Sequence, residues 1–207
     1  MRTYTIAYLA SSQADIASLT QQGAKQTQFD IAPITPHPDI DTLIEDIISS
    51  GAEALVTDYA LHDKQSGLDF TGVDIVNRIH SEKEGYPVFI LAEDMEEAEA
   101  KAHDVHIVYQ KKTMLAPKSK FFQRITRQLF KYNQELESKE DKLIQLMSQS
   151  TPLTQQQEQE VMALNFSLEK SLDKQSARTF SALTPSSQDK LQVLLNKVDA
   201  IIQEVSQ

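Results

Sequence analysis

The residue best placed to do chemistry in this sequence is Asp58, which ends a short apolar run at residues 53–58. A polar stretch that contains Gly67 and Gly72 follows it. An apolar run between turn signals is typical of a buried strand, and the carboxyl ends of parallel strands are where open α/β sheets bind ligands. Asp58 is therefore interpreted either as a functional carboxylate or as a loop acid that caps the next helix.

The other residue types that could do chemistry form no second constellation. His103 and His106 have a spacing that suggests metal binding, but they flank an expected helix-to-strand junction in a chain without cysteine, which favours surface histidines. The sequence has no Gly-rich phosphate loop and no Gly-x-Ser-x-Gly elbow. We therefore expect no catalytic residue and no enzymatic activity.

The composition is that of an ordinary soluble globular protein, with 40% hydrophobic and 24% charged residues in 207. No apolar stretch is long enough to cross a bilayer, and the amino terminus has no signal-peptide pattern. The chain has no cysteine, which excludes disulfides and thiolate chemistry. These features predict a cytoplasmic protein without membrane contact.

Apolar runs alternate with amphipathic helical segments in the first 118 residues. Helical spacing begins near Ser11 or Ser12, near Asp39 or Asp41, near Gly72 and near Met95. The PVFILA run is continuously apolar, as in a central parallel strand that is buried on both faces. The alternation predicts an α/β fold, a doubly wound five-stranded parallel sheet, with strands at residues 3–9, 29–34, 54–58, 87–92 and 107–109.

The order of these pieces resembles the receiver domain of two-component response regulators, over roughly the first 130 residues. The aspartate that ends LVTD, the helix start Gly72-Val-Asp74-Ile-Val, and the lysine after VYQ carry the resemblance. It implies a flavodoxin-like fold and a phosphorelay in which a histidine kinase phosphorylates Asp58. In that family an acidic pair after the first strand holds Mg²⁺, a Thr or Ser after the fourth strand contacts the phosphoryl group, and the lysine pairs with it.

The chain departs from this family at two of those positions. The stretch Leu9-Ala10-Ser11-Ser12-Gln13 has no carboxylate, and the nearest acid, Asp15, falls inside the expected helix. Ala92 stands at the Thr/Ser position and cannot hydrogen-bond to a phosphoryl oxygen. Because Mg²⁺ requires near-octahedral oxygen ligands, Asp58 would give at most a weak metal site.

The pairing lysine is Lys111 in one registration and Lys112 in the other, and the second registration places Tyr109 where the family often has an aromatic switch residue. Phosphoryl transfer depends on positioning and charge neutralisation. We therefore expect a degenerate receiver, or pseudo-receiver, without a cofactor, in which Asp58 and Lys111 form an ion pair that fixes one conformation. Phosphorylation of Asp58 by a histidine kinase is the alternative.

The charge is unevenly distributed, which predicts two modules at residues 1–118 and 119–207. The chain carries a net charge of −10. Residues 1–116 have 19 acids and 8 bases, a net of −11, whereas residues 117–207 have a net of +1. No acid occurs between Asp104 and Glu135, where seven lysines and arginines lie. Two charge regimes in one chain are typical of two modules.

The second module is predicted to be all-α, a helical bundle or a coiled coil. It has no glycine and no strand signal, and Pro152 and Pro185 separate three amphipathic segments. Apolar residues in the first segment follow the 3-4 spacing of a coiled-coil seam, with Lys139 as its polar position. We expect this seam to join a homodimer, the alternative being that later helices of the same chain cover it. Its members are Phe122, Ile125, Leu129, Tyr132, Leu136, Leu143 and Leu146.

The expected partners are proteins: a second copy of the chain, and a histidine kinase if the phosphorelay operates. The net charge of −10 argues against nucleic acid, although the basic window up to Lys131 is a counter-signal. Residues 119–207 contain no histidine, which excludes a histidine phosphotransfer bundle. The sequence leaves open whether the helical module is an output domain or a dimer clamp.

Overall fold

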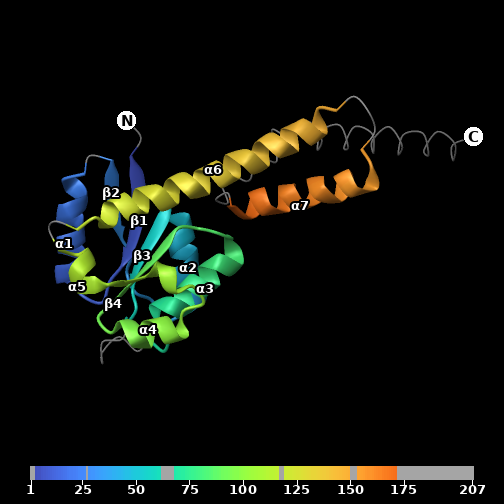
Figure 1. The fold of residues 1–207 in the computed structure, drawn as a ribbon. Coiled ribbons are helices and arrows are strands. Elements are labelled where there is room, and N and C mark those ends of the chain that lie inside the picture. The colour runs from blue at the N-terminus through green and yellow to red at the C-terminus, as the bar shows by residue number, and fades with distance from the viewer. Residues whose placement is uncertain (1–2, 27, 62–67, 117–118, 150–152, 172–207) are drawn as a thin grey trace, which may run out of the picture. The chain divides into compact units, whose positions relative to one another are not determined.

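The structure, a computed structural model, describes residues 3–26, 28–61, 68–116, 119–149 and 153–171 (Figure 1). The last expected helix, the proline interruptions and Lys118 lie outside these residues. The described residues all belong to one compact unit. None of their helices is both long enough and apolar enough to cross a membrane.

Five strands form one parallel sheet in the order β2-β1-β3-β4-β5, which confirms the predicted α/β class. The strands are β1 (Tyr4–Leu9), β2 (Phe29–Pro33), β3 (Ala54–Asp58), β4 (Val88–Ala92) and β5 (Val108–Gln110). Each lies within or close to an apolar run found in the sequence, because a strand covered on both faces must be apolar on both. In β4, for example, Phe89 and Leu91 face one core, and Ile90 and Ala92 face the other.

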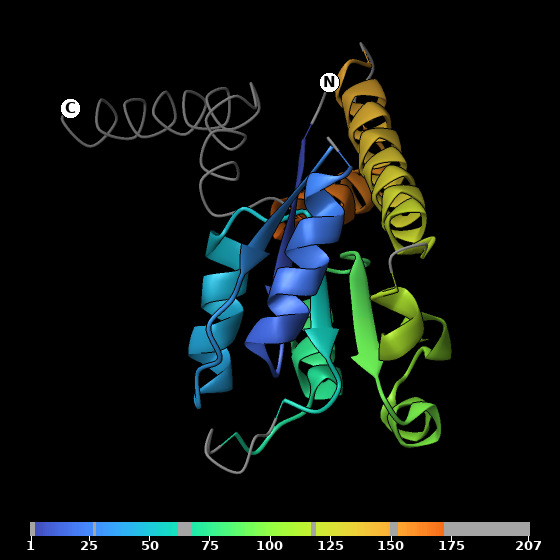
Figure 2. The same cartoon turned by 90° about the vertical axis from the view of Figure 1, so that its left-hand side faces the viewer.

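Helices cover both faces of this sheet (Figures 1 and 2). The helices are α1 (Gln13–Ala24), α2 (Ile40–Ser49), α3 (Gly72–Glu82), α4 (Met95–Lys101), α5 (Lys111–Met114), α6 (Phe121–Met147) and α7 (Gln155–Ser171), with a 3-10 turn η1 (Val105–Ile107). Buried residues of α2, α3 and α4 share one hydrophobic core with the sheet. Buried residues of α1 and α6 share the other. This is the doubly wound arrangement that the alternation predicts.

Local capping explains where several helices begin. The side chains of Ser12 and Asp39 accept hydrogen bonds from backbone N–H groups in the first turns of α1 and α2. At α3, the Asp74 carboxylate accepts hydrogen bonds from the Thr71 backbone N at 2.7 Å and the Thr71 Oγ at 2.8 Å. Thr71 and Asp74 thus form the start of this helix. Asp58 is therefore not the acid that caps the helix after β3, and its role as a functional carboxylate stays a prediction.

The apolar stripe of α6 is covered within a single chain. Phe122, Ile125 and Leu129 are buried in the core that α1 shares with the sheet. Tyr132 lies edge-on to Tyr86, with ring centroids 6.3 Å apart. This part of the predicted dimer seam is therefore part of the α/β core, and the predicted module boundary at residue 118 precedes a helix whose first turns complete that core.

Helix α7 lies beside the second half of α6 (Figure 1). Leu143 and Leu146 on α6 and Leu168 on α7 are buried, whereas Leu136 is half-buried. Lys139 Nζ donates a hydrogen bond to Ser167 Oγ at 2.7 Å. The intramolecular alternative therefore accounts for the burial of the stripe. The homodimer stays a prediction.

Leu129→Ala should lower the free energy of unfolding by about 2–5 kcal/mol, because it removes a buried leucine from the core. Leu136→Ala is the matched control, and its smaller loss should follow from the half-burial of that side chain. Urea denaturation measures both. Light scattering then measures the molar mass of the folded wild type and variants. A wild-type dimer that Leu136→Ala converts to a monomer would show that the stripe joins two copies.

Candidate functional site

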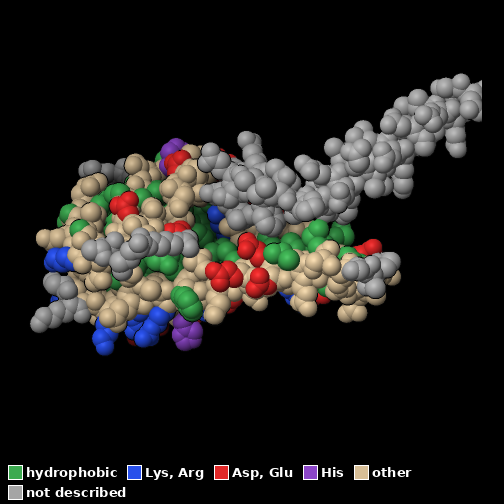
Figure 3. Space-filling view, turned by 90° about the horizontal axis from the view of Figure 1, so that it is seen from above, with side chains coloured by type: hydrophobic (Ala, Val, Ile, Leu, Met, Phe, Trp, Pro, Cys, Tyr) green, Lys and Arg blue, Asp and Glu red, His purple; other side chains and the backbone are tan. Residues whose placement is uncertain are grey.

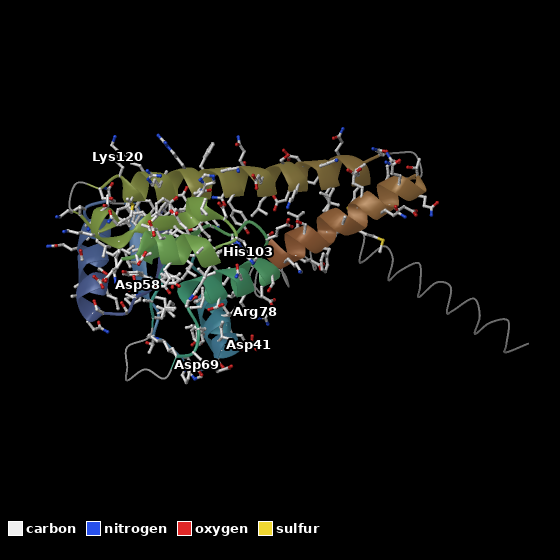
Figure 4. The ribbon with its side chains drawn as sticks, turned by 60° about the horizontal axis from the view of Figure 1, so that its bottom comes forward. Asp41, Asp58, Asp69, Arg78, His103 and Lys120 are labelled. Atoms are coloured by element: carbon white, nitrogen blue, oxygen red, sulfur yellow. The ribbon has the colours of Figure 1, made fainter. Side chains whose placement is uncertain are left out.

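The site lies at the carboxyl edge of the sheet, where the chain leaves three strands. The register pairs Leu9 with Thr57, Asp58 with Leu91, and Ala92 with Gln110. The ends of β1, β3 and β5 therefore lie near one another. This places Ser11, Asp58 and Lys111 around one crevice (Figure 4 labels Asp58).

Asp58 is 1% exposed, and its carboxylate is surrounded by hydrogen-bond donors. Its Oδ2 accepts from Ser11 N, from Ser11 Oγ and from Lys111 Nζ, each at 2.7 Å. Its Oδ1 accepts from Tyr8 OH at 3.3 Å. A carboxylate can be buried when its charge is paired and its lone pairs are occupied in this way.

Lys111 is shared between two carboxylates. Its Nζ lies 2.7 Å from Asp58 Oδ2, 2.7 Å from Asp15 Oδ2 and 3.3 Å from Ser11 Oγ. Burial alone would lower the pKa of the Lys111 ammonium, but its hydrogen bonds and charge contacts with Asp15 and Asp58 outweigh burial and raise the pKa. Lys111 is therefore a cation in the folded protein.

Asp15 and Tyr8 complete the cluster. Burial would raise the pKa of Asp15, but hydrogen bonds from Lys111 and Ser12 hold the pKa below its ordinary value. Burial raises the pKa of the Tyr8 hydroxyl, and the charges of Asp58 and Asp15 raise it further. Tyr8 is therefore a neutral donor, and the two carboxylates with Lys111 carry a formal charge of −1.

The backbone at Asp58 is held by the close approach of α3. Gly72 N donates a hydrogen bond to Tyr59 O at 2.9 Å. A Cβ built on Gly72 would collide with the carbonyl oxygen of Asp58, so only glycine fits this position. The Gly72 that marks the resemblance in the sequence therefore fixes the distance between α3 and the end of β3.

A cavity of about 470 Å³ opens beside the cluster, and its mouth is acidic. Glu93, Asp94 and Glu97 line it together with Asp58 and Lys111. Tyr59 OH donates a hydrogen bond to Glu97 Oε1 at 2.8 Å. The carboxylates outnumber the cation around this cavity, so an anionic phosphodonor would meet like charge at its entrance.

The structure brings only some of the predicted site residues together. Asp58 and Lys111 meet, whereas Lys112 is exposed on α5 and belongs to a neighbouring cavity. Ala92 is buried at the end of β4 and presents only a methyl group. Tyr109 is half-buried on β5, with its ring centroid 5.9 Å from that of Phe89. Of the two registrations, it is therefore the Lys111 one that places a lysine at Asp58.

Sequence reasoning missed Ser11 and Tyr8 as hydrogen-bond partners of Asp58, and Asp15 as the second partner of Lys111. A position inside an expected helix argues against Asp15, yet this residue lies in the first turn of α1, which starts at the same sheet edge as the crevice. The available signal was an acid in the first turn of the helix that follows β1. What the sequence alone lacked was the direction of that turn relative to β3.

The carboxylates of Asp15 and Asp58 share one cation, the Lys111 ammonium. Among the described residues, no group of three or more His, Cys, Asp or Glu could hold a metal ion. Asp15 and Asp58 are both bonded to Lys111 Nζ, which lies where a cation between them would lie. His103 and His106 are exposed, as the surface interpretation has it.

No protein-family model and no curated protein matches the chain. Two solved structures of the RcsB response regulator from Salmonella typhimurium are similar to it. One has 14% identity and a TM-score of 0.45, and covers 97% of this chain and 99% of that one. The other has 13% identity and a TM-score of 0.46, and covers 88% of this chain and 100% of that one.

A fusion that carries the yeast Spc42 trimeric coiled coil has 12% identity and a TM-score of 0.39, over 99% of this chain and 97% of that one. At these identities and scores the similarities add nothing to the sheet topology. The receiver-like fold rests on the strand order, the parallel pairing and the helices on both faces.

Replacing Lys111 by methionine should lower the free energy of unfolding by about 3–5 kcal/mol, because it leaves the buried Asp58 carboxylate unpaired. Lys112→Met is the matched control, since Lys112 is exposed, and its effect should stay within about 0.5 kcal/mol. Urea denaturation at neutral pH measures both. Equal losses in the two variants would contradict the assignment of Lys111.

Loss of the Asp15 ion pair should lower the free energy of unfolding in acid. The pKa of Asp15 is lower in the folded protein than its ordinary value, so its contribution is present above the unfolded pKa of about 3.9 and is lost as pH falls through the folded value. Asp15→Asn should flatten the pH dependence of the free energy of unfolding below about pH 4. The exposed Glu99→Gln should leave it unchanged, and a flat wild-type profile would exclude this contribution.

Proposed function

We propose that this chain is a signalling or regulatory protein that acts by contact with other proteins. Its receiver-like domain is held in one conformation by the ion-pair cluster rather than switched by phosphorylation. The observation that supports this is the Lys111 ammonium, 2.7 Å from both Asp58 Oδ2 and Asp15 Oδ2. We propose no catalytic role and no cofactor.

The hydrogen bonds of Asp58 support a receiver-like domain that is not switched by phosphorylation, which we call the silent receiver. To accept a phosphoryl group, a carboxylate oxygen must offer a lone pair to phosphorus, in line with the leaving group. Oδ2 already accepts three hydrogen bonds, two from Ser11 and one from Lys111. Attack through Oδ2 would require this cluster to open and would leave buried charges without partners, whereas Oδ1 accepts, among the described residues, only the 3.3 Å hydrogen bond from Tyr8 OH.

The surroundings of the cluster also argue against phosphorylation of Asp58. A phosphorylated aspartate needs cations and hydroxyl donors around its new oxygens. Ala92 offers a methyl group, and the cavity beside it is lined by Glu93, Asp94 and Glu97. Lys111 would remain as the one cation among these residues, and it already carries two carboxylates.

The alternative function is a working phosphoacceptor, phosphorylated on Asp58 by a histidine kinase. One observation favours it: an aspartate at the end of β3 faces a lysine at the end of β5. Lys111 would then have to leave Asp15 and pair with the phosphoryl group. Homodimerisation and a cytoplasmic location stay predictions from the sequence in either case.

Acetyl phosphate with Mg²⁺ should leave the mass of the intact protein unchanged, because Lys111 is shared between Asp58 and Asp15 and Ala92 offers no hydroxyl to a phosphoryl group. Intact-protein mass spectrometry gives the result, with Asp58→Asn as the matched control. An added phosphoryl group that is absent from Asp58→Asn would contradict the silent receiver and establish the alternative.

A further inference from the structure

Four cations form a straight row on α6. Lys120, the residue that precedes the first turn, is followed by Arg124, Arg127 and Lys131. Spacings of four, three and four residues place side chains on one face of a helix. At 1.5 Å per residue the row is about 16 Å long. We call these four residues the basic stripe.

The basic stripe faces solvent. All four residues are exposed, whereas Phe122, Ile125 and Leu129, which alternate with them in sequence, are buried on the opposite side of the helix. Figure 4 shows Lys120 at the amino end of α6, on the side turned away from the sheet. In Figure 3, most Lys and Arg side chains that are visible from above gather toward the lower left of the view.

Few charges within the chain compensate the stripe. Among the described residues, the stripe has one ion pair, between Lys131 and Glu135 at 3.7 Å, and both of its side chains are exposed. Like charges four residues apart destabilise a helix by about 0.2–0.5 kcal/mol per pair. Such a row of exposed cations creates a positive potential that would attract an anionic partner.

Aromatic side chains adjoin the stripe. The Arg124 guanidinium lies over the ring of Tyr109, 5.3 Å from its centroid, which orders the arginine before any partner binds. Phe130, next to Lys131 in sequence, is 65% exposed. Arginine and aromatic residues are the types enriched where protein interfaces are strongest.

The length of the stripe indicates which kind of anion fits. Acids follow it directly on α6, at Glu135 and Glu137. A polyanion longer than the stripe would therefore meet like charge at the carboxyl end of the row. A short acidic segment of a protein would meet only the cations, and an apolar residue in it could cover Phe130.

We propose that the basic stripe binds a short, acidic, amphipathic segment of a partner protein. This inference rests on the proposed function, since it names the surface by which a silent receiver makes its protein contact. Charge complementarity supplies the attraction, Tyr109 holds the Arg124 guanidinium in place, and the exposed Phe130 supplies an apolar contact beside the stripe.

The probe is a fluorescein-labelled synthetic helical peptide with glutamates at four-, three- and four-residue spacing and leucines beside them. Fluorescence anisotropy at low ionic strength measures its binding to the full chain. The double variant Lys120→Glu with Arg127→Glu should weaken binding about tenfold or more, since it reverses half of the stripe. The matched control, Lys25→Glu with Lys112→Glu, changes the net charge equally at exposed lysines outside the stripe and should change binding less than about twofold.

Three outcomes overturn the inference. They are no binding of the peptide, an equal loss in both double variants, and tighter binding of single-stranded DNA or of phosphatidylserine vesicles than of the peptide. Urea midpoints close to that of the wild type establish that both double variants are folded. The acetyl phosphate experiment separates the two claims. Phosphorylation of Asp58 together with peptide binding would reject the silent receiver and retain the stripe. No phosphorylation together with no peptide binding would retain the silent receiver and reject the stripe.

Discussion

The arrangement at the carboxyl edge of the sheet depends on one buried charge, the carboxylate of Asp58. Burying an isolated carboxylate is unfavourable by several kcal/mol, so it must be paired and hydrogen-bonded. Lys111 supplies the pairing, and Ser11 and Tyr8 supply the hydrogen bonds. These partners come from β1, from the turn after β1 and from the end of β5. The pairing register of the sheet and the charge of Asp58 are therefore parts of one constraint.

A second constraint is the long helix α6, whose apolar stripe needs two different covers. The sheet and α1 bury its first half at Ile125 and Leu129, and α7 lies along its second half. Two contacts join these helices to the end of α3 and the turn after it: Lys170 Nζ donates a hydrogen bond to Ser81 O in α3 at 3.2 Å, and Tyr132 packs against Tyr86 in the turn. The helical extension is thus attached to the α/β core at the edge opposite Asp58.

Together these constraints support our proposal of a protein that stays in one state and does not switch. A switch needs two packings whose free energies differ by only a few kcal/mol. Here the lysine that would pair with a phosphoryl group is shared by Asp58 and Asp15, and Ala92 has no hydroxyl to form a second state. On this proposal, protein contacts depend on surfaces that exist without modification, and the outward face of α6 is the surface we propose.

The strands could be predicted from the sequence, because a strand buried on both faces must be apolar whatever its neighbours are, as residues 88–92 are. The apolar stripe of α6 could be predicted too, since helical periodicity is local. That the sheet and α7 cover this stripe could be learned only from the folded chain, because periodicity does not specify the covering surface. Only the structure chose Lys111 over Lys112 and brought Asp15 to it. A side chain's direction across a crevice depends on strand order and register, which no single segment of sequence contains.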